Sequence, residues 1–146
     1  ASTHREEKLY LLKEADQAVL DTGKLAEALT GVTKALELVG PKTLGDTLNC
    51  VEKGGIVCNT GVLGGVYGIK FFDPIKFIPN GVYLTGFHSN WPSQKVMDQI
   101  FDFLDSHRLK LPIGKTFPFS LIREACMAQD MGIVNGKIVV YMEDNK

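Results

Sequence analysis

The sequence predicts an α/β fold in which a mostly parallel sheet is flanked by helices. Two short apolar runs carry this prediction, residues 35–39 and 56–60, and they end at Gly40 and Gly61. Pro41 follows the first glycine and suits the first turn of a helix, where its missing N–H leaves no bond unmade. Strand, helix and strand in this order form a βαβ unit. Ligands of open α/β sheets bind beyond the carboxyl ends of such strands.

One missing motif limits the fold further. No G-x-G-x-x-G sequence, which forms the turn that receives the pyrophosphate of a dinucleotide, follows a strand in this chain. The phosphate-binding turn expected of a dinucleotide fold is therefore missing. The 146 residues suffice for one domain or slightly more. The 16 basic and 17 acidic residues give a net charge of −1, which argues against a nucleic-acid partner.

The first third of the chain predicts two helices and two strands. Thr3 and Glu6 have the spacing of a capping box and open a helix whose inward residues are Leu9, Leu12 and Ala15. A strand over 16–21, a short helix over 24–30 that ends at Gly31, and a strand over 33–39 follow.

The middle of the chain continues the alternation. The helix that begins at Pro41 carries an apolar stripe of Leu44, Leu48 and Val51, and Gly54 and Gly55 end it. The strand over 56–60 comes next. Residues 61–80 form a long irregular stretch that is too rich in Phe, Ile and Tyr for a solvated linker, and a strand over 82–87 follows it.

The last third predicts two more helices and two extended segments. Ser93 caps a helix with one apolar face of Met97, Ile100, Phe101 and Leu104. Residues 113–119 are extended. Ser120 caps a helix with Ile122, Ala125 and Cys126 inward, and the Asn135–Gly136 turn leads to a strand over 137–141.

The sequence contains no motif for a metal site, a signal peptide or a membrane span. The cysteines Cys50, Cys58 and Cys126 are predicted to be free thiols, buried in the first two cases, which fits a reducing compartment. The histidines are scattered, so no zinc site is expected from these residues. The amino terminus is polar and no apolar run is long enough to cross a bilayer. We expect a cytoplasmic protein with no membrane partner.

Six segments, in order, resemble the medium-chain dehydrogenase/reductase family, in its quinone-oxidoreductase-like branch of the zinc-binding dehydrogenases. They are residues 2–8, 36–40, 54–61, 72–74, 84–87 and 136–140. The match begins where the second Rossmann strand of the family ends. The resemblance therefore implies the carboxyl-terminal part of a reductase, cloned as a fragment or encoded truncated, without the catalytic domain, the first strand and the glycine-rich turn.

The resemblance also implies an incomplete Rossmann-like sheet, a function and a division of the chain. Residues 1–110 would form a partial Rossmann cofactor-binding domain, and 111–146 a strand–helix–strand segment that returns to the catalytic domain of the parent enzyme. That parent would transfer hydride from NADP(H) to a small-molecule quinone or enone without metal. We expect no catalytic residue in this chain, no zinc, and weak or absent NADP(H) binding because the pyrophosphate turn is missing.

At the amino terminus, Ser2, Thr3, Arg5 and Lys8 stand where the family receives the adenosine ribose. NAD-binding folds usually place an acidic residue there, whereas hydroxyls and cations beside a helix start suit the 2′-phosphate of NADP. The alternative is that Thr3 only caps the helix and that the two cations are solvated.

The strand ends supply the other candidate cofactor contacts. The resemblance implies that Val39, Gly40, Thr60, Gly61 and Val62 contact the nicotinamide half through backbone groups, where glycine permits close approach. The alternative is ordinary turn chemistry, and for Gly54 and Gly55 it is preferred.

Two further groups are placed by the resemblance. The loop Phe87, His88 and Ser89 would close over the nicotinamide carboxamide, although an isolated loop histidine is more often an ordinary polar residue than a catalytic one. Lys137 would lie near a cofactor phosphate, or it is a common strand-end lysine.

Two expectations concern strand edges. In the family, the strand that matches Val82–Phe87 pairs with its copy in a second subunit, which implies a homodimer. The alternative function is accordingly a non-catalytic, dimerising interaction module. With strands one and two of the order 3-2-1-4-5-6 outside the chain, the strand over 16–21 would lack a neighbour. It would be loose, move to another edge, or pair by exchange with a second chain.

Overall fold

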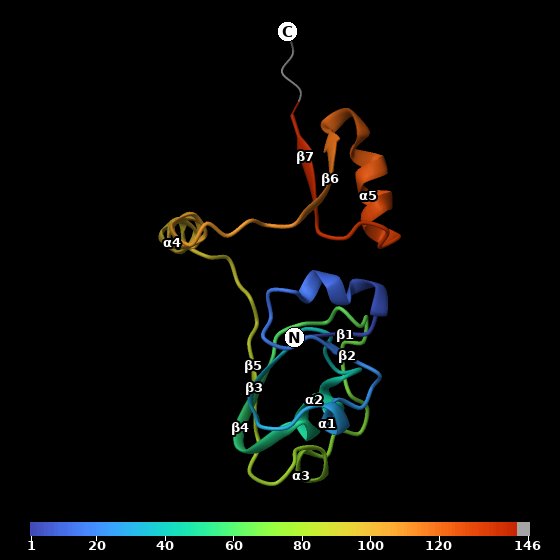
Figure 1. The fold of residues 1–146 in the computed structure, drawn as a ribbon, viewed down its shortest axis with the longest axis vertical. Coiled ribbons are helices and arrows are strands. Elements are labelled where there is room, and N and C mark those ends of the chain that lie inside the picture. The colour runs from blue at the N-terminus through green and yellow to red at the C-terminus, as the bar shows by residue number, and fades with distance from the viewer. Residues whose placement is uncertain (143–146) are drawn as a thin grey trace. The chain divides into compact units, whose positions relative to one another are not determined.

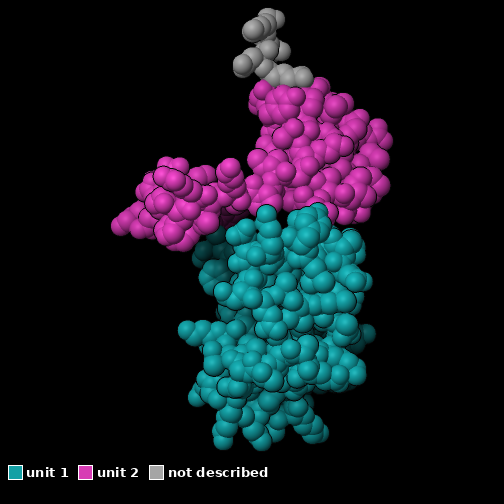
Figure 2. All heavy atoms as spheres, viewed as in Figure 1, with its two compact units in different colours: residues 1–90 teal, residues 91–146 magenta. Residues whose placement is uncertain are grey.

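The structure is a computed structural model that describes residues 1–142 of the chain. The chain divides into two compact units, Ala1–Asn90 and Trp91–Lys146, which Figure 2 shows in two colours. Each unit has its own sheet and its own buried cluster. The expected division after residue 110 concerns a catalytic domain outside this chain and stays a prediction.

The main sheet of the first unit has three parallel strands in the order β3-β4-β5 (Figure 1). They are β3 (Val32–Glu37), β4 (Val51–Asn59) and β5 (Tyr83–Gly86), and helix α2 (Leu44–Asn49) joins the first two. In register, Val57 lies between Ala35 on one side and Leu84 on the other. The predicted βαβ unit and the parallel α/β sheet are confirmed.

The core of this unit forms where α2 packs against the sheet. Leu48 of α2 and Val57 of β4 are fully buried. The cluster around them also contains Leu25, Leu44, Cys50, Val51 and Val82. Complete burial of one such aliphatic side chain contributes roughly 1.5–3 kcal/mol, so α2 and the central strand dominate the stability of the unit.

Around α2 the structure differs from the sequence prediction. Pro41 lies in a turn before the helix, in which the carbonyl of Gly40 accepts from the backbone N–H of both Thr43 and Leu44 at 3.0 Å. Helix α2 therefore starts at Leu44, and Val51 belongs to β4 instead of the helix stripe.

Strand β4 also runs through the two glycines that were expected to precede it. Gly54 has a φ of +91°, which favours glycine, and its N–H donates to the carbonyl of Gly81 at 2.7 Å. The register between β3 and β4 shifts at this point, between Val32 and Lys34. The glycines thus form an irregularity inside a long strand, as glycine in a strand often does.

At the amino terminus, the expected unpaired strand does have a neighbour. Strand β1 (Ser2–Thr3) pairs in parallel with β2 (Val19–Leu20) in a separate two-stranded sheet. The predicted helix is a 3₁₀-helix, η1 (Glu6–Leu12), whose N-cap Arg5 makes no side-chain cap bond. The predicted capping box is therefore wrong.

The helices in the connecting segments of this unit are short. Helix α1 (Leu25–Ala28) precedes β3, and Leu25 N–H donates to the Asp46 carboxylate at 2.8 Å. The irregular stretch before β5 contains one helical turn, α3 (Pro74–Phe77), where the Asp73 side chain accepts from Ile75 N–H. This agrees with the predicted lack of a long element there.

The second unit is a parallel strand–helix–strand motif preceded by a helix (Figure 1). Helix α4 (Gln94–Ser106) begins as predicted, with Ser93 Oγ accepting from Val96 N–H at 3.4 Å. Strand β6 (Ile113–Pro118), η2 (Phe119–Leu121), helix α5 (Ile122–Asp130) and β7 (Lys137–Tyr141) follow.

Two expectations for α5 are wrong. Ser120 lies inside η2, and the N-cap of α5 is Leu121, which makes no side-chain cap bond. Cys126 is exposed, and Ile122 keeps 41% of its surface exposed; the buried cluster is Phe117, Ala125 and Ala128.

Among the described residues, no helix combines the length and the apolar character that a membrane crossing requires.

Candidate functional site

Three candidate loops follow the ends of the three neighbouring strands. Val39 and Gly40 come after β3, residues 60–62 after β4, and residues 87–89 after β5. Because the strands are parallel and adjacent, these loops lie at one edge of the sheet. The structure therefore brings eight of the predicted site residues together at the place where open α/β sheets bind ligands.

The first two loops are joined by backbone hydrogen bonds. The N–H groups of Thr60 and Gly61 both donate to the Glu37 carbonyl, at 3.0 and 3.1 Å. Farther along, Gly64 N–H donates to the Val39 carbonyl at 2.9 Å. The loops after β3 and β4 therefore form one rigid surface.

Close packing of these loops explains both strand-end glycines. A Cβ atom on Gly61 would lie 1.7 Å from the Leu38 carbonyl oxygen. A Cβ atom on Gly40 would lie 2.5 Å from the Gly61 carbonyl oxygen, and Gly40 has a φ of +94°. The ordinary structural interpretation therefore accounts for these glycines, and their contact with a cofactor stays a prediction.

Glu37 is a site residue that sequence reasoning missed. Its side chain is buried, with 4% of the residue exposed, and its carboxylate accepts four hydrogen bonds. The donors are Val39 N–H at 2.7 Å, Gly40 N–H at 3.0 Å, Thr43 Oγ1 at 3.0 Å and Thr47 Oγ1. The carboxylate therefore fixes the turn after β3. The available signal was an acidic residue inside an apolar strand that ends at glycine.

The third loop is open to solvent. Phe87 N–H donates to the Asn59 carbonyl at 3.0 Å, and Phe87 keeps 60% of its surface exposed. His88 and Ser89 are exposed as well. The side-chain oxygen of Asn59 is buried and has no hydrogen-bond partner among the described residues.

The amino-terminal candidates lie at the end of β1. The Thr3 carbonyl accepts from Asp21 N–H at 2.7 Å, and Thr3 Oγ1 accepts from Arg5 N–H at 3.3 Å. Arg5 is exposed, and Lys8 is half-buried on η1. The first turn of η1 carries Glu6 and Glu7. Any affinity for a phosphate here would therefore come from the two cationic side chains, because the expected α-helix N-terminus is absent.

A groove of about 550 Å³ connects two of these groups within the first unit. Ser2 of β1 and Val39 of the turn after β3 both line it, and Glu37 and Thr43 lie beside Val39 in its wall. Pockets of this size hold small ligands.

Lys137, the last predicted site residue, is the first residue of β7 in the other unit. It is exposed, and its N–H donates to the Pro112 carbonyl at 2.7 Å.

The described residues do not fit a zinc site. No group of three or more His, Cys, Asp or Glu side chains among them could hold a metal ion. The pKa of the Cys50 thiol is raised because the group is desolvated by burial and lies near the Asp46 carboxylate. The neutral thiol is thereby favoured, which suits a packed core side chain better than a thiolate ligand.

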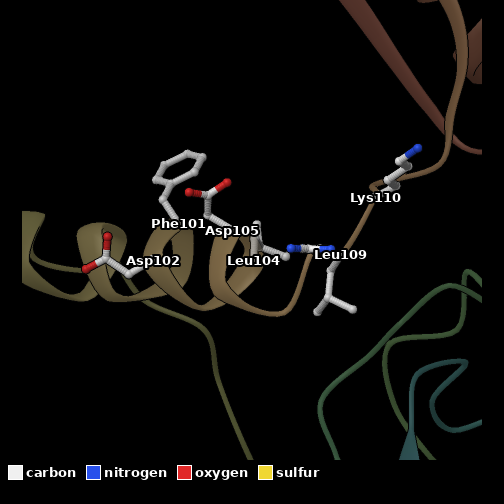
Figure 3. Close-up of a pocket in the computed structure, with 7 residues that line it drawn as sticks. Phe101, Asp102, Leu104, Asp105, Leu109 and Lys110 are labelled. Atoms are coloured by element: carbon white, nitrogen blue, oxygen red, sulfur yellow. The ribbon is translucent and has the colours of Figure 1, made fainter.

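A second hollow, of about 560 Å³, lies at the end of α4 in the second unit. Its side chains point in several directions and bring no polar groups to a common centre (Figure 3). None of the predicted site residues lines it; the lining consists of Phe101, Asp102, Leu104, Asp105, Arg108, Leu109 and Lys110. It offers no arrangement suited to chemistry.

Comparison with known proteins identifies the family. The sequence model described as zinc-binding dehydrogenase matches residues 13–140. Among solved structures, AibC aligns with a TM-score of 0.84 at 24% identity, over 99% of this chain and 42% of that one. The quinone oxidoreductase from Coxiella burnetii aligns with a TM-score of 0.72 at 18% identity, over 95% and 43%. The mycobacterial protein Rv1454c, complexed with NADPH, aligns with a TM-score of 0.72 at 21% identity, over 95% and 47%.

These findings confirm the predicted resemblance and the predicted fold class. Among curated proteins, no match was found. The chain spans less than half the length of the solved structures it resembles. The comparisons therefore establish the family and the fold of this chain. They do not establish the activity of a whole enzyme.

Proposed function

The chain belongs to the zinc-binding dehydrogenase family, and we propose that it is the cofactor side of an NADP(H)-dependent oxidoreductase of the quinone or enone reductase type. The bound nucleotide supplies the hydride, and the chain binds and orients it. No residue of this chain is assigned a catalytic role. On its own the chain is expected to be inactive.

The observation that carries this proposal is the common sheet edge of the three strand-end loops. Val39, Gly40 and Thr60–Val62 form one hydrogen-bonded surface there, and the loop 87–89 lies beside it. Backbone groups held rigidly in this way suit a flat nicotinamide ring, because preorganised contacts lose little entropy on binding. Glu37 would support the binding indirectly by fixing the turn after β3.

The preference for NADP over NAD rests on the residues after β1. Ser2, Thr3, Arg5 and Lys8 include hydroxyls and cations but no carboxylate, although Glu6 and Glu7 follow closely. An arginine makes charge-assisted hydrogen bonds to phosphate oxygens. We propose that Arg5 and Lys8 meet the 2′-phosphate. For the second unit, taken by itself, Lys137 is proposed as a phosphate contact.

A titration of the full 146-residue chain with NADPH and with NADH, followed by amide NMR, tests the proposal. We expect weak binding in which NADPH shifts the amide signals of Gly40 and Gly61 more than NADH does. Charge reversal in Arg5→Glu/Lys8→Glu should abolish the difference between the two nucleotides. The matched control is Lys13→Glu, an exposed lysine after η1. Unchanged signals for both glycines at the highest soluble NADPH concentration would contradict the proposal, as would tight binding.

A second candidate function is a non-catalytic, dimerising interaction module. It is favoured by β5, which is an edge strand of its sheet and exposes 64% of Tyr83. We propose a homodimer through Val82–Phe87 in either case. Sedimentation should give a dimer for the unmodified chain and a monomer for Tyr83→Lys. A monomer at all concentrations would argue against both the dimer and this second function.

We also propose that the protein acts in the cytoplasm. The three cysteines Cys50, Cys58 and Cys126 are free thiols in the structure. Free thiols persist in reducing compartments. Fractionation of cells that express the protein checks this, and recovery in an oxidising compartment would oppose it.

A further inference from the structure

The chain contains two asparagine–glycine pairs, Asn80–Gly81 and Asn135–Gly136, and the proposed function uses neither pair. All four residues are exposed. Asparagine is a thermally labile residue, and a following glycine increases its reactivity because no Cβ atom shields the glycine nitrogen. That nitrogen can attack the side-chain amide carbon of the asparagine. Since the two pairs are identical in sequence, their relative reactivity depends on how the structure holds each backbone.

The first pair is fixed in a hydrogen-bonded turn. Val82 N–H donates to the Pro79 carbonyl at 3.0 Å, and Gly81 has a φ of +79°. Asn80 does not belong to the described non-glycine residues with a positive φ, so the turn is of type II. In this turn the ψ of the second residue is about +120°, which holds the Asn80 Cβ and the Gly81 nitrogen roughly 120° from eclipsed. The five-membered ring of the reaction requires these two atoms to be eclipsed.

Two further contacts hold this turn in place. The Gly81 carbonyl accepts from Gly54 N–H of β4 at 2.7 Å. A Cβ atom on Gly81 would lie 2.6 Å from the Cγ of Lys53, so the glycine packs closely against that side chain. Ring closure at Asn80 would rotate the peptide group that these contacts hold, and it would break the turn. The fold therefore protects this pair.

The second pair, which leads into β7, has no such turn. Lys137 N–H donates across to the Pro112 carbonyl at 2.7 Å instead of closing a turn. No backbone hydrogen bond among the described residues uses the Asn135 carbonyl or the Gly136 N–H. The Asn135 carbonyl lies against Gly114, which has no side chain to obstruct it, and this contact is made by packing alone. Rotation about the Asn135 Cα–C bond therefore breaks no hydrogen bond of its own peptide group.

We propose that Asn135 is a site of spontaneous deamidation and isoaspartate formation, and that Asn80 is protected from the same reaction. The proposal is independent of nucleotide binding, because neither asparagine belongs to the proposed cofactor contacts. Gly136 has a φ of +103°, and a Cβ atom on it would clash with the Pro112 carbonyl oxygen, so only glycine fits there. The structure therefore requires the residue that makes Asn135 reactive.

The reaction needs only water. The Gly136 nitrogen forms a bond to Cγ of Asn135 while the bond from Cγ to Nδ2 breaks, and the proton of the attacking N–H leaves with the amide group as ammonia. Water then opens the cyclic imide. Its addition at the Cγ carbonyl gives aspartate, and its addition at the main-chain carbonyl gives isoaspartate, in which the chain runs through Cβ and Cγ. No oxidant or reductant is involved, and either product carries one new carboxylate.

Isoaspartate at this position would change the entry into β7. It lengthens the main chain by one carbon atom and places a carboxylate beside the strand. Lys137, whose N–H pairs with the Pro112 carbonyl, follows the modified residue by two positions. β7 is one of two strands in its sheet, and its residues Ile138 and Val140 pack against the buried cluster of the second unit. The modification should therefore weaken the pairing of β6 with β7.

The test is incubation of the full 146-residue chain at mildly alkaline pH, followed by digestion and mass spectrometry with electron-transfer fragmentation, which separates isoaspartate from aspartate. We expect Asn135 to deamidate at least tenfold faster than Asn80, with isoaspartate as the main product. In concentrated guanidinium chloride, where the turn is lost, the two rates should become similar. Equal rates in the folded chain, or a faster reaction at Asn80, would overturn the proposal. A tenfold difference that persists in the unfolded chain would refute it as well, because the flanking sequence would then set the rates.

Variants of the two asparagines assign the isoaspartate of the whole chain to its source. Asn135→Gln keeps the amide but would need a six-membered ring, so total isoaspartate, measured by enzymatic methylation, should fall at least fivefold. Asn80→Gln is the matched control and should leave the total unchanged. Both positions are exposed, so both variants should fold. A fall of similar size in Asn80→Gln, or no fall in Asn135→Gln, would contradict the proposal.

Discussion

The two sheets of the first unit differ in what holds them together. The β3–β5 sheet packs against α2 and contains Val57, which is fully buried. The β1–β2 sheet has two residues in each strand, and only Val19 among them packs against the core. The comparison teaches that a complete βαβ unit supplies its own core. A short strand pair that has only the 3₁₀-helix η1 beside it among the described elements, and no buried residue on that helix, depends mainly on a few backbone bonds.

The largest effect is expected where the loops of the stronger sheet touch. Gly61→Ala would place a Cβ atom 1.7 Å from the Leu38 carbonyl oxygen, so the loops after β3 and β4 must separate. We expect a loss of at least about 3 kcal/mol in the free energy of unfolding, measured by urea denaturation. The control is Gly68→Ala, because a Cβ atom there meets nothing within 4 Å. Equal stability of the two variants would show that the loop packing is wrong.

The next effect compares the two sheets directly. Leu48→Ala removes a fully buried side chain of α2 and should cost about 3 kcal/mol. Leu20→Ala, in β2, removes a side chain that is 36% exposed and should cost less than about 1 kcal/mol. Thermal and urea unfolding of both variants checks the difference. Similar losses would mean that the amino-terminal sheet shares the main core.

A smaller effect is expected at the turn after β3. Glu37→Gln replaces one carboxylate oxygen with a donor, although all four partners of the carboxylate are donors. The amide NH2 can face Thr47, whose hydroxyl can accept from it, but the three donors on the other oxygen lose the negative charge of their acceptor, which should cost about 1 kcal/mol. Glu52→Gln changes an exposed glutamate of β4 in the same way and should change stability by less than about 0.5 kcal/mol. Urea unfolding measures both, and unchanged stability in Glu37→Gln would contradict the four-bond arrangement.

The stronger sheet was also the part that the sequence predicted well. Strands β3 and β4 overlap the apolar runs 35–39 and 56–60 that precede Gly40 and Gly61, so local pattern and tertiary structure agree there, although the start of α2 and the extent of β4 were predicted wrongly. The amino terminus was predicted poorly because local signals compete there. Thr3 has the spacing of a cap, but its carbonyl pairs with Asp21 in the β1–β2 sheet and its hydroxyl accepts from Arg5. Such a tertiary pairing is not visible in the spacing of Thr3 and Glu6.

The candidate site shows the same limit. The strand ends predicted which loops gather at one edge, because parallel strands fix that arrangement. The function of Glu37 could not be predicted, since its four donors lie two to ten residues away and converge only after the turn and α2 have formed. The reason for Gly61 was hidden as well, because the contact with Leu38 joins two loops that a helix and a strand separate.

The smallest expected effect concerns the rate at which Cys50 is alkylated, which reports how often the main core opens to solvent. Burial, with a contribution from Asp46, raises the pKa of Cys50, so less thiolate is present at a given pH than in an exposed cysteine of ordinary pKa. Cys50 is also 8% exposed and donates to the Thr47 carbonyl at 3.1 Å. Alkylation of Cys50 by iodoacetamide at pH 8 should therefore be at least tenfold slower than that of the exposed Cys126, as measured by mass spectrometry of the digested protein. Leu48→Ala opens the core beside Cys50 and should accelerate its alkylation, whereas Leu20→Ala should not. If Leu20→Ala accelerates it equally, opening of the β1–β2 sheet exposes the main core, and the two sheets do not differ as their packing indicates.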